Sequence, residues 1–159
     1  MVDELSRSTR RFVEIVNRMG IDLEVVELPS STRTAVDAAA AIGCSVAQIV
    51  KSLVFRTVAG KEPLMVIASG VNRVNESRIA EFVGEPIEKA DAAYVREKTG
   101  FVIGGVPPIG HTVTIRTFID EDLLKLDEIW AAAGTPNSVC KLSGDILLRI
   151  TNGDVKVIK

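Results

Sequence analysis

Two side chains and one loop in this sequence are suited to chemistry. Lys51 lies in "IVKSLVF", where most neighbours are apolar, and by the two-residue period of a strand it shares a face with Leu53 and Phe55. A lysine in such a place extends its ammonium group to water, pairs with an acid, or lines a pocket. A pocket cation could hold a phosphate or orient a carbonyl oxygen; the alternative is a strand-end lysine in solvent.

The segment "GGVPPIGH", residues 104–111, combines three glycines, two prolines and the only histidine. Proline lacks an N–H and restricts the residue before it, so we expect neither a helix nor a regular strand. Glycines let backbone N–H groups approach a ligand closely, as an oxyanion site requires, although a tight structural turn is the alternative. His111 could titrate near neutrality, but a lone histidine at a strand start more often packs or hydrogen-bonds than catalyses.

Composition narrows the class of protein. The chain has 159 residues, 47% hydrophobic and 25% charged, which predicts one domain with a real core. A net charge of −2 provides no overall basic field, so we expect no DNA partner. One histidine and the separated Cys44 and Cys140 do not make a zinc set, and we expect no metal or other cofactor. No signal peptide and no apolar run of roughly 20 residues is visible, which favours a cytoplasmic protein with reduced core thiols and no membrane partner.

Hydrophobic periodicity predicts a mixture of helices and strands. Within a single domain spanning residues 1–159, residues 1–20 hold an amphipathic helix, placed at 3–19. Further helices are expected at 34–43, 75–84, 91–100 and 143–150, and strands at 22–28, 49–58, 64–69, 111–119, 128–134, 138–142 and 154–158. The acidic run 120–122 is expected to be a solvated helix start, and Trp130 a core residue. Without a clean βαβ rhythm, the pattern favours an α+β fold with a mixed sheet.

Several motifs together resemble one known family. The segments "QIVKSLVF", "SGVNRVN", "TGFVIGGVPPIGH" and "IWAAAGTPN", followed by Leu142–Ser143–Gly144, resemble the YbaK/prolyl-tRNA synthetase-associated domain in order and spacing. The resemblance runs from about Thr34 to the C-terminus. It implies a single editing domain whose mostly antiparallel sheet or barrel-like core is flanked by helices. It also implies hydrolysis of the ester between a tRNA and a wrong amino acid.

The resemblance transfers roles to individual residues. Lys51 matches the lysine of the family's K-[ST]-L motif, and Gly104 begins its G-x-x-x-P loop; these two are the implied catalytic positions. The implied substrate-binding positions are Ser52, Gly105, Val106, Pro107, Pro108, His111 and Ser143. His111 receives no catalytic role, because the well-known histidine of the related editing domain lies elsewhere in its sequence.

The sequence thus predicts an aminoacyl-tRNA deacylase that acts in trans on tRNA(Pro) or a related tRNA. Its expected partner is the acceptor end of the mischarged tRNA, with an aminoacyl-tRNA synthetase as a second possible partner. An aminoacyl ester is already activated, so a backbone cradle and the ribose hydroxyl of the tRNA could suffice without a nucleophile–base pair. The alternatives are a non-catalytic module that binds aminoacyl-tRNA or a synthetase, and a hydrolase of some small ester or nucleotide.

Overall fold

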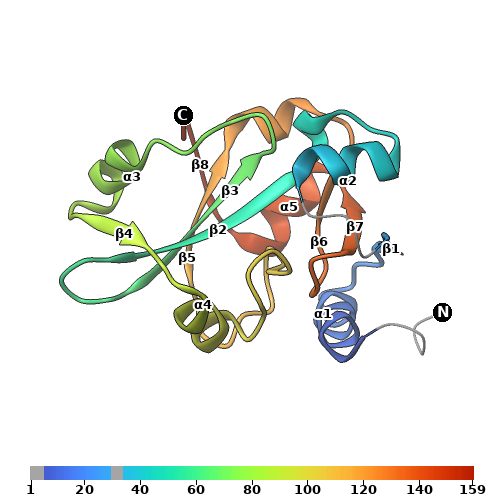
Figure 1. Ribbon diagram of the computed structural model, residues 1–159, viewed down its shortest axis with the longest axis horizontal. Coiled ribbons are helices and arrows are strands. Elements are labelled where there is room, and N and C mark those ends of the chain that lie inside the picture. Colours follow the sequence, from blue (N-terminus) through green and yellow to red (C-terminus); the bar gives the residue numbers. More distant parts are fainter. Residues whose placement is uncertain (1–5, 30–33) are drawn as a thin grey trace.

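The structure is a computed structural model, and it describes residues 6–29 and 34–159. In this part of the chain the strands form two sheets, a larger one in the order β4-β2-β3-β5-β8 and a smaller one in the order β1-β7-β6 (Figure 1). The helices are α1 (Arg7–Arg18), α2 (Ala35–Ile42), α3 (Glu76–Val83), α4 (Ala92–Thr99) and α5 (Gly144–Thr151), with 3-10 turns η2 (Val46–Gln48) and η3 (Glu121–Lys125). The strands are β1 (Glu24–Glu27), β2 (Val50–Thr57), β3 (Pro63–Ser69), β4 (Ile87–Lys89), β5 (Arg116–Asp120), β6 (Ile129–Ala132), β7 (Ser138–Leu142) and β8 (Asp154–Lys156).

The strand pairings confirm a mixed, mostly antiparallel α+β fold. Pairs β1–β7, β6–β7, β2–β3 and β2–β4 are antiparallel, whereas β3–β5 and β5–β8 are parallel. The two sheets meet at a parallel bridge between Ile49 and Trp130. The core is therefore bounded by two joined sheets within one domain.

Local chemistry sets the limits of the helices. Each of the five begins at a side-chain cap, and the capping residues are Ser6, Thr34, Asn75, Asp91 and Ser143. Helices α2, α3 and α4 end at Gly43, Gly84 and Gly100, each with a positive φ, as expected from the sequence. Of the N-terminal helix predicted at 3–19, residues 3–5 lie outside the described residues.

Both faces of the larger sheet are covered. On one face Leu64 and Val66 of β3 and Phe118 of β5 pack with Ile79 of α3. On the other face the next residues along the same strands join a core with α1, α4, α5 and the smaller sheet; its fully buried members include Phe12, Met65, Ile67, Ile119 and Leu147. Because successive side chains of each strand point to opposite faces of the sheet, the same strands contribute to two separate hydrophobic cores.

The strand predicted at 111–119 is wrong in its first half. Strand β5 begins only at Arg116, because the backbone N–H groups of Thr112 and Val113 donate to the carbonyls of Thr99 and Lys98 at the end of α4. The segment therefore continues the loop and joins no strand ladder. The three-residue strand β4 was not predicted, since so short an element gives no periodic signal.

Two further expectations need correction. Asp120 is not a solvated residue: it is 1% exposed and caps η3 by accepting from the Asp122 N–H. Trp130 is only half-buried rather than in the core. Both differences arise where the two sheets and the segments between them meet, which local sequence patterns do not describe.

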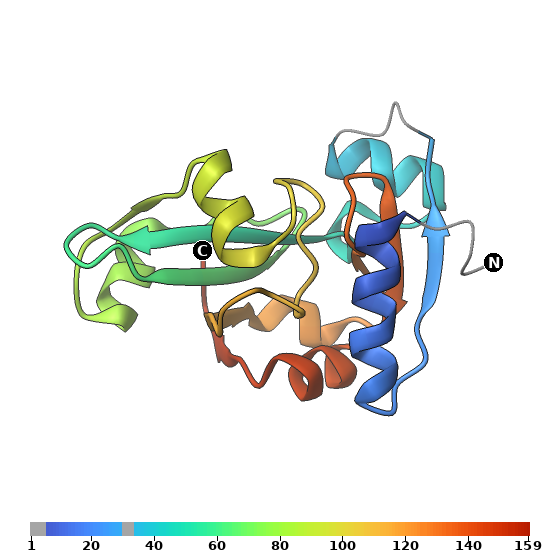
Figure 2. The ribbon, with the colours of Figure 1, turned by 90° about the horizontal axis from the view of Figure 1, so that it is seen from below.

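Helix α1 lies beside the smaller sheet (Figure 2). Phe12 and Val16 on its inner face are 0% and 1% exposed. Thr9 Oγ1 donates to Ser138 Oγ at 3.1 Å, which ties α1 to the start of β7. The helix is therefore part of the core.

Candidate active site

A pocket of about 520 Å³ lies between the two sheets. All six residues from Val50 to Phe55 of β2 line it. Strand β4 pairs with β2 over Phe55–Thr57, and the Ala90 N–H donates to the Val54 carbonyl, so the edge of β2 before Val54 has no strand partner on this side. An open strand edge can offer backbone donors and acceptors to a ligand.

Lys51 lies in the wall of this pocket, which agrees with the pocket-cation alternative of the two that its sequence context left open. Its Nζ donates to the main-chain oxygen of Asn72 at 2.8 Å. Burial lowers the pKa of Lys51, and the carboxylate of Asp120 opposes this shift. Lys51 is thus neither a fully solvated lysine nor one paired directly with an acid.

Ser52 supplies a polar atom without a partner. Among the described residues, its hydroxyl is the buried side-chain oxygen that makes no hydrogen bond. Buried hydroxyls normally have partners, so this unpaired one marks a point in the pocket wall where hydrogen bonding is incomplete. The rest of the wall is mostly apolar: Leu28, Ala35, Ala38, Ile49, Val95, Ile103, Val106, Trp130, Ala132, Pro136 and Val139.

The glycine–proline loop reaches the pocket through its first residues. Gly104 and Val106 line the pocket, and Gly104 has a φ of +85°, a conformation that favours glycine. The Gly105 N–H is already used, since it donates to the carbonyl of Val102 at 3.0 Å. The N–H groups of Gly104 and Val106 therefore remain as candidates for a substrate contact.

Gly105 fixes the loop and does not face the pocket. A Cβ at this position would lie 2.7 Å from the backbone of Thr135, and the Gly105 carbonyl accepts from the Gly134 N–H at 3.0 Å. This close approach requires glycine and holds the loop against the turn between β6 and β7. Pro136 of the same turn lines the pocket beside Gly104.

The end of the loop turns away from this pocket. Pro108 and His111 line a second cavity of about 280 Å³, together with Thr112, Thr114, Thr117 and Thr151. His111 Nε2 donates to the carbonyl of Pro107 at 2.8 Å. Burial lowers the pKa of His111; the hydrogen bond to the Pro107 carbonyl opposes this shift, and the nearby Arg11 adds to it. His111 shapes the loop and does not meet Lys51 in this pocket.

Helix α1 contacts the glycine–proline loop and the residues just before it. The guanidinium of Arg11 lies 4.2 Å from the centre of the Phe101 ring, and its Nη2 donates to the carbonyls of Thr99 and Gly110 at 3.4 Å. A Cβ at Gly110 would lie 3.1 Å from Ile15 Cδ1. The loop is thus held between α1 and the β6–β7 turn, which preorganises it.

The remaining candidate positions lie elsewhere. The Ser143 hydroxyl accepts from the Ile146 N–H and caps α5, and the structure places Ser143 outside the pocket wall.

The two cysteines differ in burial. Cys140 is fully buried, and burial raises the pKa of its thiol to about 12. Cys44 is half-buried, and burial raises the pKa of its thiol as well. Neither thiol is suited to act as a nucleophile at neutral pH.

Sequence reasoning missed part of the pocket. The pocket wall also includes residues from segments that carry no reactive pattern: Thr34, Lys89, Trp130 and the apolar residues of α2.

Within residues 6–29 and 34–159 no group of three or more metal-ligating side chains occurs. In the same ranges, no helix has the length and apolar character needed to cross a membrane.

The structure is thus an α+β protein with a pocket between its two sheets, lined by a lysine and by part of a glycine–proline loop. Residues 29–150 match the family model described as "Aminoacyl-tRNA editing domain". The chain therefore belongs to this family, that of the YbaK/prolyl-tRNA synthetase-associated domain.

Individual relatives agree with this assignment. "Uncharacterized protein YwhH" of Bacillus subtilis (strain 168) is 30% identical over 120 residues, 76% of each chain. A structure solved as a "putative trans-editing enzyme for prolyl tRNA synthetase" is 44% identical and covers 98% of this chain and 99% of its own, with a TM-score of 0.93. "Hypothetical protein APE2540" is 30% identical, with coverages of 91% and 96% and a TM-score of 0.84.

Proposed function

We propose that the protein is an aminoacyl-tRNA deacylase that removes wrongly attached amino acids in trans from tRNA(Pro) or a related tRNA. Membership of the editing-domain family supports the reaction, and the 44% identical structure supports the kind of tRNA. The observation that carries the proposal is the pocket itself, which brings Lys51, Ser52 and Gly104 together from β2 and the loop. We infer that it acts in the cytoplasm, where aminoacyl-tRNA is formed.

The dimensions of the pocket favour the end of the tRNA as the bound part. Its volume lies within the range of about 300–1,000 Å³ typical of small-molecule sites. Such a pocket takes the terminal adenosine with its aminoacyl ester, while the body of the tRNA stays outside. The apolar wall suits an uncharged small side chain, and the family's range includes cysteine, alanine, serine and threonine.

In the proposed mechanism, water attacks the ester carbonyl carbon. The oxygen that becomes negative is stabilised by a backbone N–H of Gly104 or Val106, and Lys51 orients the ester or holds the phosphate of the terminal adenosine. The bond from the carbonyl carbon to the ribose oxygen then breaks, and a proton from the attacking water ends on that oxygen. The products are a free amino acid and an uncharged tRNA.

The substrate class is tested with a panel of mischarged tRNAs. Alanine, cysteine, serine and threonine are each attached to tRNA(Pro) and to an unrelated tRNA, with correctly charged prolyl-tRNA(Pro) as the control. Since the described residues contain no metal-ligating cluster, the assay is run with a chelator present. We expect hydrolysis of at least one mischarged tRNA(Pro) and sparing of prolyl-tRNA(Pro). Binding without hydrolysis throughout the panel would instead support a non-catalytic regulatory module.

A further inference from the structure

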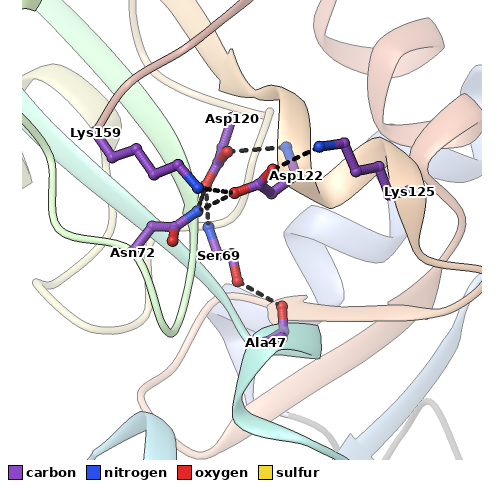
Figure 3. Close-up of polar contacts among 7 residues, drawn as sticks. All are labelled: Ala47, Ser69, Asn72, Asp120, Asp122, Lys125 and Lys159. Atoms are coloured by element: carbon purple, nitrogen blue, oxygen red, sulfur yellow. Dashed lines mark hydrogen bonds and ion pairs between the residues drawn. The ribbon is translucent and has the colours of Figure 1, made fainter.

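The motif "SGVNRVN" places Asn72 between Lys51 and an acidic cluster, formed by the buried Asp120 and the partly exposed Asp122. The main-chain oxygen of Asn72 accepts from Lys51 Nζ at 2.8 Å. Its side-chain Nδ2 donates to Asp120 Oδ2 and to Asp122 Oδ2, both at 2.8 Å (Figure 3). One residue thus joins the pocket lysine to two carboxylates through different atoms.

The Asn72 carbonyl, which accepts from Lys51 Nζ, lies in a turn that several hydrogen bonds hold in place. The Asn72 N–H donates to the Ser69 carbonyl at 3.0 Å, and the Ser69 N–H donates to Asp120 Oδ2 at 3.0 Å. The Ser69 hydroxyl donates to the Ala47 carbonyl at 2.7 Å (Figure 3). At Gly70 a Cβ would lie 2.5 Å from the Val46 carbonyl oxygen, so this turn leaves no space for a side chain. These contacts therefore constrain the turn after β3.

The two carboxylates of the acidic cluster differ in their surroundings, because Asp122 also accepts from two lysines. Asp120 is 1% exposed, whereas Asp122 accepts from Lys159 at 2.9 Å and from Lys125 at 3.1 Å. The hydrogen bonds from Lys159, Asn72 and Lys125 lower the pKa of Asp122. A buried carboxylate such as Asp120 needs such donors, and Asn72 supplies one to it and one to the partly exposed Asp122.

We propose that Asn72 is a positioning residue for Lys51, because its carboxamide, fixed by Asp120 and Asp122, holds its main-chain carbonyl where it orients the lysine in the pocket wall. This inference rests on the proposed function, in which Lys51 acts on the aminoacyl ester. The side chain of Asn72 acts only through Lys51, and the buried charge of Asp120 favours the ammonium form of that lysine.

The test compares Asn72→Ala with Lys159→Ala, which removes an outer partner of Asp122 but keeps both side-chain bonds of Asn72. Steady-state deacylation is measured on the mischarged tRNA identified by the panel. Asn72→Ala should lower kcat by about tenfold to a hundredfold, as expected for a misplaced catalytic group, with KM changed less than about twofold. Lys159→Ala should behave like wild type. Full activity of Asn72→Ala, or equal losses in both variants, would overturn the inference.

A second variant keeps the inference testable if Asn72→Ala does not fold. Asp120→Asn keeps the size of the side chain but replaces one of the two oxygens that accept from Ser69, Asn72 and Asp122, and it removes a charge that raises the pKa of Lys51. The contact that fixes the Asn72 carboxamide should therefore weaken, and the pKa of Lys51 should fall. The other charged groups of the cluster, Asp122, Lys125 and Lys159, are unchanged. The alkaline limb of kcat/KM and the Lys51 side-chain NMR titration should both move to lower pH. No movement of either would contradict the proposal.

Lys51→Ala, measured in the same assay, separates the proposed function from the positioning role of Asn72. If Lys51→Ala is as active as wild type, the proposed site of the reaction is wrong. If Lys51→Ala is inactive while Asn72→Ala keeps full activity, the proposed function stands and the positioning role of Asn72 fails.

Discussion

Gly104 combines a left-handed backbone conformation with a proposed role in the reaction. Its φ of +85° is unfavourable for any residue with a Cβ, yet the nearest atoms to such a Cβ would be those of Pro136 at 3.7 Å, an ordinary contact. Strain from φ, and not a clash, is therefore the expected effect of a substitution here. Gly105 differs, because a Cβ there would overlap the Thr135 backbone.

We predict that Gly104→Ala lowers kcat by about a hundredfold, since a misplaced oxyanion donor costs roughly 3–4 kcal/mol. The strain should also lower the free energy of unfolding by about 1–2 kcal/mol. His111→Ala, which removes the bond to the Pro107 carbonyl and a ring that lines the second cavity, should have a smaller effect on kcat. Both variants are compared in one deacylation assay after thermal melts. An inactive His111→Ala beside a nearly normal Gly104→Ala would point to an imidazole base instead.

Cys140 gives a prediction about stability and pH. Its folded pKa of about 12 lies above the ordinary thiol value of about 8.5, so the unfolded chain loses this proton first as pH rises. The stabilising contribution is complete below about pH 8.5 and is lost between there and about pH 12. The advantage of wild type over Cys140→Ala in free energy of unfolding should therefore shrink by about 1.4 kcal/mol per pH unit above that point. Denaturant unfolding of both proteins at pH 7.5 and 10 checks this, and a constant difference would contradict the burial argument.

At the scale of elements, strand β2 and helix α1 position the site. Strand β2 carries Lys51 and Ser52, and the shortness of β4 leaves the edge of β2 before Val54 without a strand partner on this side. Helix α1 precedes the segment matched by the family model, yet it holds the loop through Arg11 and buries Phe12. We infer that the functional unit includes α1.

Phe12→Ala should lower the free energy of unfolding by about 3–5 kcal/mol, the usual cost of deleting a buried aromatic side chain. Arg10→Ala on the exposed side of the same helix is the matched control and should change it by less than about 0.5 kcal/mol. Chemical denaturation of both variants provides the measurement. If Phe12→Ala is as stable as wild type, α1 is dispensable for the core.

Much of the element pattern could be predicted from sequence because it depends on local signals. Caps and terminal glycines marked α2, α3 and α4, and apolar runs marked β2 and β3. The start of β5 was wrong because residues 112–113 bond to the end of α4, a partner that alternation in sequence does not reveal. Non-local hydrogen bonds override local propensity in such segments.

At the scale of the whole molecule, the pocket results from the way two sheets join. Lys51, Gly104 and Val106 were predicted as site residues and do share this pocket, whereas Trp130 and the α2 residues entered it through tertiary packing. The burial of Asp120 and its link to Asn72 were likewise invisible in a sequence where 120–122 reads as a solvated acidic run. Charge and periodicity predict exposure only while no distant segment covers a residue.

The central claim is that this pocket hydrolyses the aminoacyl ester and that Lys51 takes part. The most direct measurement is single-turnover deacylation of a mischarged tRNA(Pro) by wild type and Lys51→Met, with circular dichroism melts of both proteins. We predict that Lys51→Met loses most of the activity while its melting temperature stays at or above that of wild type, because removing a partly buried amine relieves its desolvation. A folded Lys51→Met that hydrolyses the ester at the wild-type rate would contradict the account.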